Sequence, residues 1–416
     1  MRETNADPTR MSNMESATLR GIDKAEEVSL SPMLSVEQCD DTTITVFLNS
    51  TGARLRMQRA LYGKILAFET PRTIASVTQG DARLELAIDR LRGLGFLVGE
   101  TDAALVVPPR PVTDPPYRLF DCPAHKSSSG STDIVVIGVP YDGGDHEAAG
   151  ARHGPIAIRK TSLQLLYRLD KRTGQPLGWF DADVRRPVLR GVTIGDVGDV
   201  VVTSGEPQTQ TFARLRDVLE SFHGGQRRVW SLVGGDATTS FPLIEVMQAR
   251  DEVDVLRIGD LEHDASAAQS TFLSIATLAS SVLALPRVDR FVQIGTSRPD
   301  DVALPGFSAV TASALLDGGG ASIEAHLAPG RPIHLGLDMT ILASPGDAPA
   351  DRARIAYTDL RSLLHEIGER YRIVSVDLVG LNPLKGDWGS KSVEAVHLLL
   401  AMLDAATNRN GRNMPV

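Results

Sequence analysis

A chain of 416 residues is long enough for two ordinary domains, and its 42% hydrophobic and 23% charged residues are typical of a globular protein. A formal net charge of −9, without any dense run of lysine and arginine, excludes nucleic acid as the expected partner. Two cysteines are too few for a disulfide framework or a thiolate metal site. Residues 1–27 lack the apolar core of a signal peptide, and no apolar run reaches membrane-spanning length. We therefore expect a cytoplasmic protein with no membrane partner.

The sequence of the first third of the chain predicts a small domain between two irregular segments. Polar composition predicts a disordered tail over residues 1–27, and proline and serine predict a linker over 108–131. Between them we predict a domain over 28–107, made of a strand, three helices and a closing pair of strands. The predicted elements are a strand at 43–48, helices at 53–68, 71–77 and 81–94, and strands at 95–98 and 104–107.

From residue 132 onward, short apolar strands alternate with helical stretches. Nearly continuous apolar strands between helices indicate a parallel sheet that is covered on both faces, an α/β domain over 132–408. Glycine and aspartate cluster where these strands end, which is where parallel sheets bind ligands. The predicted strands are 134–139, 229–233, 253–258, 290–295, 333–337 and 373–377, and the predicted helices are 211–222, 268–285, 357–370 and 392–407.

Three carboxylates follow one of these strands at alternate positions. Asp260, Glu262 and Asp264 share one face if the chain stays extended, and they repel one another unless protons or a cation neutralise them. Oxygen ligands at this spacing suit a hard divalent metal ion. The alternative is a solvated acidic loop after a strand.

Six motifs in this region resemble, in content and order, those of the arginase/agmatinase (ureohydrolase) superfamily. The resemblance covers about residues 131–408 and implies an arginase-like three-layer α/β fold with a mostly parallel sheet. The motifs are Gly138-Val-Pro-Tyr-Asp-Gly-Gly with Gly150-Ala-Arg-His-Gly-Pro-Ile-Ala-Ile-Arg159, Ile194-Gly-Asp-Val-Gly-Asp-Val, Val233-Gly-Gly-Asp-Ala-Thr-Thr, Asp260-Leu-Glu-His-Asp264, Leu337-Asp-Met-Thr-Ile-Leu-Ala-Ser-Pro345 and Asp377-Leu-Val-Gly-Leu-Asn-Pro383.

The chain departs from the family pattern at the positions that carry its chemistry. Members that this chain resembles hold two manganese ions with two histidines and four aspartates, and the ions activate a water that attacks a guanidinium carbon. Of these ligands the chain keeps Asp260, Asp264 and Asp338. The departures are Ala237 and Glu262 for the two histidines, Thr340 for an aspartate, Gly380 for the glutamate that anchors the guanidinium, and Ala148 for an early arginine.

The resemblance assigns roles to the polar residues that remain. We expect Asp260, Glu262, Asp264 and Asp338 to bind manganese or another hard divalent cation, as one ion or none, with Asp260, Asp264 and Asp338 also catalytic. We expect three residues of the neighbouring loops to bind substrate: Asp142, His146 and Asp236. Asp236 has a second interpretation as a stabiliser of its own turn. His334 lies deep in a strand and reads as a core residue rather than a ligand.

Residues 28–107 are similar in element order to the winged-helix peptide-recognition domains of ribosomal peptide-modifying systems. The similarity rests on Phe47-Leu-Asn-Ser-Thr-Gly, the Pro71-Arg-Thr-Ile turn and Leu91-Arg-Gly-Leu-Gly-Phe-Leu. It implies that a leader peptide binds by adding a strand to an exposed sheet edge. The alternative is a winged-helix dimerisation or capping module.

Two functions follow from these resemblances. The first is a metal-dependent hydrolase of a C–N bond in a guanidino or amidine group, acting in a natural-product or modified-peptide pathway on a small guanidino molecule or a peptide. The second is a catalytically inactive arginase-fold protein that binds a peptide or a partner protein. The resemblance also implies a homo-oligomer, which the front domain could block. Standard arginase or agmatinase activity is not expected, given Ala237, Thr340 and Gly380.

Overall fold

The computed structural model divides the chain into two compact units, residues 1–109 and 110–416, which are described separately. The predicted disordered tail lies outside the described residues, apart from Glu27. The structure describes residues 27–31, 34–48, 54–99, 111–125, 132–144, 149–203, 206–222, 228–259, 273–295, 304–328, 330–342, 354–385 and 388–408.

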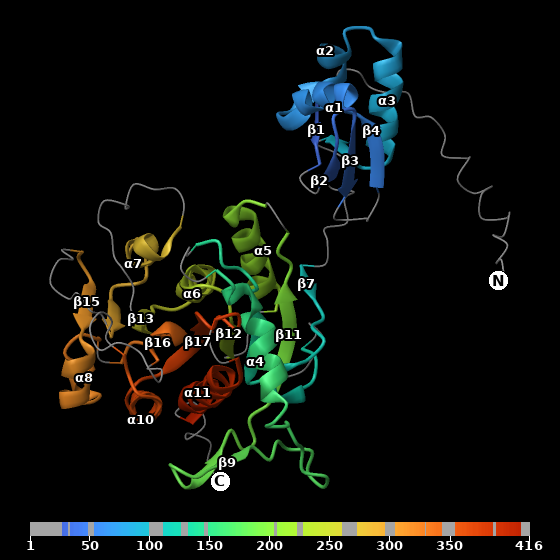
Figure 1. Ribbon diagram of the computed structural model, residues 1–416. Coiled ribbons are helices and arrows are strands. Elements are labelled where there is room, and N and C mark those ends of the chain that lie inside the picture. Colours follow the sequence, from blue (N-terminus) through green and yellow to red (C-terminus); the bar gives the residue numbers. More distant parts are fainter. Residues whose placement is uncertain are drawn as a thin grey trace. The chain divides into compact units, whose positions relative to one another are not determined.

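The first unit packs helices against two small antiparallel sheets (Figure 1). One sheet has the strand order β5-β1-β6 and the other has β2-β3-β4. Buried apolar residues of both sheets and of the helices form one core. The elements are β1 (Glu27–Leu30), β2 (Leu34–Cys39), β3 (Thr43–Leu48), β4 (Arg54–Gln58), α1 (Arg59–Ile65), η2 (Leu66–Glu69), β5 (Arg72–Thr73), α2 (Ile74–Thr78), α3 (Ala82–Gly93) and β6 (Leu97–Gly99).

The sequence predicted this unit in part. The strand at 43–48 and the helix at 81–94 are confirmed as β3 and α3. Helix α3 begins where Asp81 accepts hydrogen bonds from the free amides of Arg83 and Leu84. The predicted helix at 53–68 is wrong over its first turns, because residues 54–58 pair with β3 as strand β4. Strand β6 pairs with β1, and the predicted strand at 104–107 lies outside the described residues.

The second unit is built on a nine-stranded sheet with the order β15-β14-β13-β16-β17-β12-β8-β11-β7. Every neighbouring pair is parallel except β11 with β7. The predicted arginase-like α/β fold with a mostly parallel sheet is therefore confirmed. The strands are β7 (Val112–Thr113), β8 (Ile134–Gly138), β11 (Ile194–Val200), β12 (Val229–Val233), β13 (Asp254–Ile258), β14 (Phe291–Ile294), β15 (Phe307–Val310), β16 (Ile333–Asp338) and β17 (Ile373–Val379).

Helices cover both faces of this sheet (Figure 1). Because side chains alternate along a strand, Val136 packs into one core and Val135 into the other. The first core holds side chains of α4, α10 and α11, and the second holds those of α5, α6 and α7. The helices are α4 (Gly154–Ser162), α5 (Gln208–Ser221), α6 (Ser240–Gln248), α7 (Ile275–Leu283), α8 (Ala312–Gly318), α9 (Ala321–Glu324), α10 (Tyr357–Arg370) and α11 (Trp388–Asn408).

Shorter pieces complete this unit. A hairpin of two short antiparallel strands leaves the sheet between α4 and β11, and single turns of 3-10 helix follow several strands (Figure 1). These pieces are β9 (Trp179–Asp181), β10 (Arg186–Val188), η4 (Leu119–Asp121), η5 (Ala151–His153), η6 (Ala237–Thr239) and η8 (Met339–Ile341). Among the described helices, none is both long and apolar enough to cross a membrane.

The predicted linker over 108–131 is wrong for residues 111–125. Strand β7 pairs with β11 at the edge of the large sheet, and Leu119 and Phe120 are fully buried in its core. The backbone amide of Phe120 donates to the hydroxyl of Ser162 on α4. The prolines of this segment suggested an irregular linker. The free energy gained by burying the two apolar side chains in the core is larger than the cost of ordering the segment.

Candidate functional site

The carboxyl ends of five parallel strands of the second unit lie side by side and form one edge, and the described residues among the predicted site residues lie on or just after these strands. The registers place Gly138, Val233, Leu378, Leu337 and Ile258 in one row across β8, β12, β17, β16 and β13. Of the predicted site residues, Asp142, Asp236 and Asp338 are described. The others, His146, Asp260, Glu262 and Asp264, lie outside the described residues.

Asp338, at the end of β16, is buried and bound by donors of the protein itself. Its Oδ1 accepts from the backbone amide of Thr340 at 3.0 Å and from the Thr340 hydroxyl at 2.7 Å. Its Oδ2 accepts from Nη2 of Arg257 at 3.1 Å. Both oxygens of this carboxylate therefore already interact with donors, one of which is a full positive charge.

Arg257 was not predicted as a site residue. Within β13 it follows two apolar residues and precedes a third, and its side chain is 2% exposed. Nη1 lies 3.8 Å from Oδ1 of Asp377 on β17, and 3.4 Å from the hydroxyl of Ser240 at the start of α6. An arginine in the middle of an apolar strand was the signal that could have revealed it, because a buried charge requires a partner.

A buried hydrogen-bonded chain continues from Asp377 to His334. Asp377 Oδ2 lies 2.6 Å from Nε2 of His334, and Nδ1 of His334 lies 2.8 Å from the hydroxyl of Ser375. Burial by itself would raise the pKa of Asp377, but the hydrogen bond from His334 and the charge of Arg257 lower it below its usual value. This lowering of the pKa favours the anionic form of Asp377, and His334 is a hydrogen-bonded core residue, as its position in the strand predicted.

Glycines within or directly after three neighbouring strands leave the space that these groups occupy. A Cβ at Gly336 would lie 3.2 Å from Nη1 of Arg257 and 3.2 Å from Oδ2 of Asp377. A Cβ at Gly259 would lie 2.8 Å from the Cβ of Asp338. At Gly380, which has φ +73°, a Cβ would overlap Oδ1 of Asp338. The position where the family has its guanidinium-binding glutamate is therefore closed to any side chain in this conformation.

Asp142 and Asp236 hold the loops above this edge. Asp142 accepts from the backbone amide of Gly150 at 2.6 Å and forms an ion pair with Arg152 at 2.7 Å. Burial raises the pKa of Asp142, but these donors outweigh it and hold the pKa below its usual value. Asp236 accepts from the amide of Gly144 at 2.7 Å and from the amide of Thr238 at 2.8 Å. Asp142 and Asp236 therefore bind the backbone of Gly150 and Gly144, respectively, while substrate binding by either stays a prediction.

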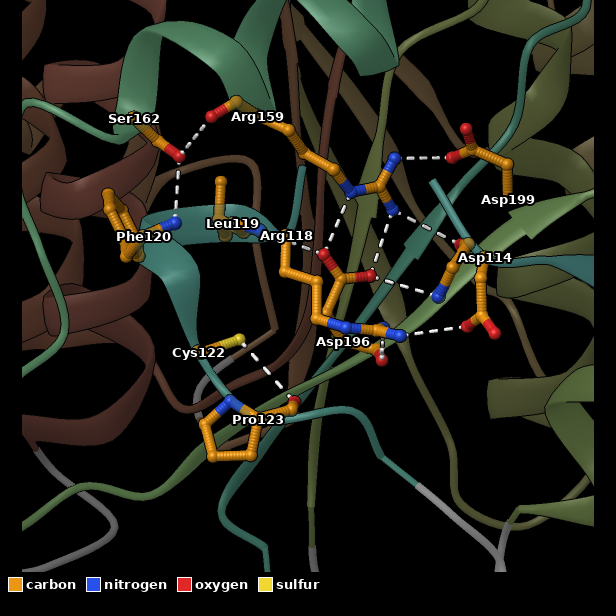
Figure 2. A network of polar contacts seen from close by, with 11 residues as sticks. Asp114, Arg118, Leu119, Phe120, Cys122, Pro123, Arg159, Ser162, Asp196 and Asp199 are labelled. Carbon is orange, nitrogen blue, oxygen red and sulfur yellow. Dashed lines mark hydrogen bonds and ion pairs between the residues drawn. The ribbon is translucent and has the colours of Figure 1, made fainter. Parts of the chain in front are cut away.

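The first and second motifs meet in a separate buried network, which Figure 2 shows. Arg159 on α4 donates Nε and Nη2 to Asp196 on β11 at 2.8 and 2.9 Å, and its Nη1 contacts Asp199. Asp196 also accepts from the amide of Leu119, so it joins residues 111–125 to the sheet. Cys122 lies beside this network, and burial together with the charge of Asp196 raises the pKa of its thiol. This network joins α4 to β11 and to residues 111–125, and Asp199 is paired with Gly138 at the carboxyl end of β8.

The described residues do not fit the two-metal site that the resemblance implies. Ala237 is buried and offers no ligand atom. The Thr340 hydroxyl donates to Asp338 instead of facing a cation, and Arg257 places a positive charge on the same carboxylate. A cation at Asp338 would be repelled by that guanidinium, since like charges in a buried region interact strongly.

The comparisons with known proteins agree with this fold. The family model described as "Arginase family" matches residues 132–404. The chain is 31% identical over 117 residues to N(1)-aminopropylagmatine ureohydrolase of Thermococcus kodakarensis, which covers 28% of this chain and only 35% of that protein. It is 27% identical over 264 residues to an agmatinase of Proteus mirabilis, which covers 61% of this chain and 81% of that protein.

Solved structures show the same fold at low identity. Proclavaminate amidino hydrolase from Streptomyces clavuligerus superposes with a TM-score of 0.56 and 22% identity, covering 72% of this chain and 98% of that one. Formimidoylglutamase from Bacillus subtilis superposes with a TM-score of 0.55 and 16% identity, covering 72% of this chain and 93% of that one. Since the family model spans more than half of its residues, this chain belongs to the arginase family.

Proposed function

We propose that this chain is a member of the arginase family that binds a peptide through its first unit and does not perform two-metal hydrolysis in its second. The observation that carries the proposal is the environment of Asp338. This carboxylate is the one predicted metal ligand among the described residues, and Arg257 and Thr340 occupy both of its oxygens. Ala237 and Gly380 support the same conclusion, because they remove a ligand atom and the guanidinium anchor of the family motif.

The peptide ligand is supported by the strands of the first unit. In the sheet β2-β3-β4, both outer strands pair on one side only among the described residues, so each offers a backbone edge. Strand β4 carries Arg54 and Arg56, whose side chains are exposed. An extended peptide that adds to such an edge gains backbone hydrogen bonds from either strand, and the arginines favour an acidic sequence.

A second candidate is a C–N hydrolase of guanidino or amidine groups that uses one hard divalent ion. Two observations favour it: the named relatives are ureohydrolases and amidino hydrolases, and three carboxylates follow β13 in the sequence. Gly259, the last described residue before Asp260, lies directly against Asp338. In this candidate, Asp260, Glu262 and Asp264 hold the ion with Asp338.

Turnover separates the two candidates. The full-length protein, loaded with Mn²⁺ or Mg²⁺, is incubated with arginine, agmatine and other guanidino or amidine compounds, and urea and ammonia are measured. We expect no release above that of Asp260→Ala, the control that removes the first carboxylate of the acidic motif. Metal-dependent release that Asp260→Ala abolishes would establish the hydrolase and overturn our proposal.

Peptide binding is tested by selecting binders from a random peptide library on the full-length protein. Hydrogen exchange then locates the binding site on the chain. We expect protection of residues 34–39 or 54–58, and weaker binding in Arg56→Glu. Protection confined to the second unit would contradict the role that we assign to the first.

A further inference from the structure

Arg257 combines a full charge with nearly complete burial in the middle of the large sheet. Its strand, β13, lies between β14 and β16 and is buried along its whole length. A charged group in such a place lowers stability unless opposite charges and hydrogen bonds compensate it. The partners of Arg257 therefore explain why the residue is tolerated.

These partners are two buried carboxylates on neighbouring strands. Arg257 bonds Asp338 on β16 at 3.1 Å and faces Asp377 on β17 at 3.8 Å. The side chains of these aspartates are 7% and 0% exposed. The registers pair Arg257 with Gly336, and Gly336 with Asp377, so the arginine reaches across the glycine to the second strand. One cation thus lies between two anions on three adjacent strands.

A divalent ion could perform the same electrostatic work, and the family resemblance implies one at Asp338. The guanidinium differs because it is covalently fixed and is present as soon as the chain folds. Gly336 leaves room for this contact, since a Cβ there would lie 3.2 Å from both Nη1 and the carboxylate and would require one of them to shift slightly. His334 and Ser375 continue the network through hydrogen bonds of the protein itself, while Nε of Arg257 and Oδ1 of Asp377 have no hydrogen-bond partner among the described residues.

We propose that Arg257 is an internal cation that replaces a bound metal ion in holding Asp338 and Asp377 together, so that the second unit is stable without divalent metal. Removing the guanidinium leaves two buried anions with a vacant space between them. That space then becomes a site for a hard divalent cation, because carboxylate oxygens are the ligands such ions prefer. The proposal rests on the same site as the proposed function, but it concerns stability rather than turnover.

The test is thermal unfolding of the full-length protein with EDTA, Mn²⁺ or Mg²⁺, because a ligand that binds only the native state raises the melting temperature. The wild type should melt at the same temperature in all three. Arg257→Met should melt several degrees lower in EDTA and recover part of the loss with Mn²⁺. Arg257→Lys, which keeps a cation, should melt between the two and respond little to metal.

The double variant Arg257→Met with Asp338→Asn is the matched control. It removes one charge of each sign, so it should be more stable in EDTA than Arg257→Met and should not respond to Mn²⁺. Arg257→Met that folds but gains nothing from either ion overturns the proposal. If that variant does not fold in any condition, the melting temperature of the wild type with and without metal tests the proposal. Stabilisation of the wild type by Mn²⁺ that Asp338→Asn abolishes overturns the proposal, and indifference to both ions upholds it.

These outcomes differ from failure of the proposed function. Turnover by a wild type whose melting temperature ignores EDTA would refute the binding role and leave the internal cation intact. If the wild type shows no turnover but EDTA lowers its melting temperature, and Asp338→Asn removes that effect, the internal cation would be refuted and the binding role would stand.

Discussion

Gly380 shows how a single residue decides which chemistry this edge permits. Its backbone has φ +73°, and a Cβ would overlap Oδ1 of Asp338, which Thr340 holds from the other side. Returning the family's glutamate to this position would therefore displace the carboxylate before it offered a guanidinium anchor. Restoration of the family motif by point substitution fails for this physical reason at position 380.

We expect Gly380→Ala to lower the free energy of unfolding by more than the cost of its φ alone. Gly174→Ala is the matched control: Gly174 has φ +70° and nothing within 4 Å of its Cβ position. The control should lose about 1–2 kcal/mol, the cost of a left-handed alanine. Gly380→Ala should lose more, and urea unfolding measures both. Equal losses would show that Asp338 does not fill the space beside Gly380.

Cys122 should be chemically inert in the folded protein. Its side chain is buried, and burial and the negative charge of Asp196 raise the pKa of the thiol, so the reactive thiolate is scarce at neutral pH. In a Cys39→Ser background, a thiol reagent should modify Cys122 only as the protein unfolds in denaturant. Rapid modification of the native protein would contradict the packing of residues 111–125 against α4.

At the scale of elements, the β9–β10 hairpin is attached to two helices by ion pairs whose aspartates are buried and whose arginines are partly exposed. Asp181 of β9 binds Arg361 of α10 at 2.5 Å, and Arg186 of β10 binds Asp404 of α11 at 2.5 Å. His365 on α10 and His397 on α11 both lie near Asp181 and Arg361. Burial lowers the pKa of both histidines below the usual 6.5, so the fold favours their neutral forms.

This junction should make stability fall in mild acid. As the pH drops below 6.5, the unfolded chain binds protons at His365 and His397 before the folded protein does, so the free energy of unfolding decreases until the pH passes the folded-state pKa values. Urea unfolding between about pH 7 and pH 5 should show this slope. The double variant His365→Gln with His397→Gln should flatten it, whereas a variant of the exposed His153 should not. An unchanged slope in the double variant would place the protons elsewhere.

Strand β7 and the turn after it should be required by the second unit. Leu119 and Phe120 each bury a large apolar side chain, worth roughly 1.5–3 kcal/mol apiece. A truncated protein of residues 110–416 should therefore fold, while one of residues 126–416 should be less stable by several kcal/mol in urea. Equal stability of the two would return residues 111–125 to the role of a linker.

The sequence predicted the elements that carry a clear hydrophobic pattern. It did not predict those whose structure depends on pairing with a distant strand. Apolar runs such as 134–139 and 229–233 predicted β8 and β12, because strands buried on both faces need apolar residues throughout. Residues 54–58 alternate polar and apolar side chains, but the sequence analysis predicted a helix there. Only their pairing with β3 makes them a strand. Asp338 was identified from its motif. Arg257 was missed although an arginine within an apolar strand marks a buried charge, because its partners Asp338 and Asp377 lie on other strands and only the strand pairing brings them together.

At the scale of the whole molecule, an arginase-family unit follows a small unit of antiparallel sheets. The second unit has the family's fold, and the buried ion pair of Arg159 with Asp196 joins α4 to β11 within it. The winged-helix identity and the peptide-binding role of the first unit stay predictions. A binding protein with this fold needs the buried network of Arg159 and Asp196 for stability, but it does not need metal ligands at positions 237 and 340.

The most direct test of this account is anomalous diffraction at the manganese absorption edge from crystals of the full-length protein grown with Mn²⁺. We predict no anomalous peak at Asp338, with the guanidinium of Arg257 within hydrogen-bonding distance of that carboxylate. Two peaks bridged by Asp338, with Arg257 turned away, would contradict both the binding role and the internal cation.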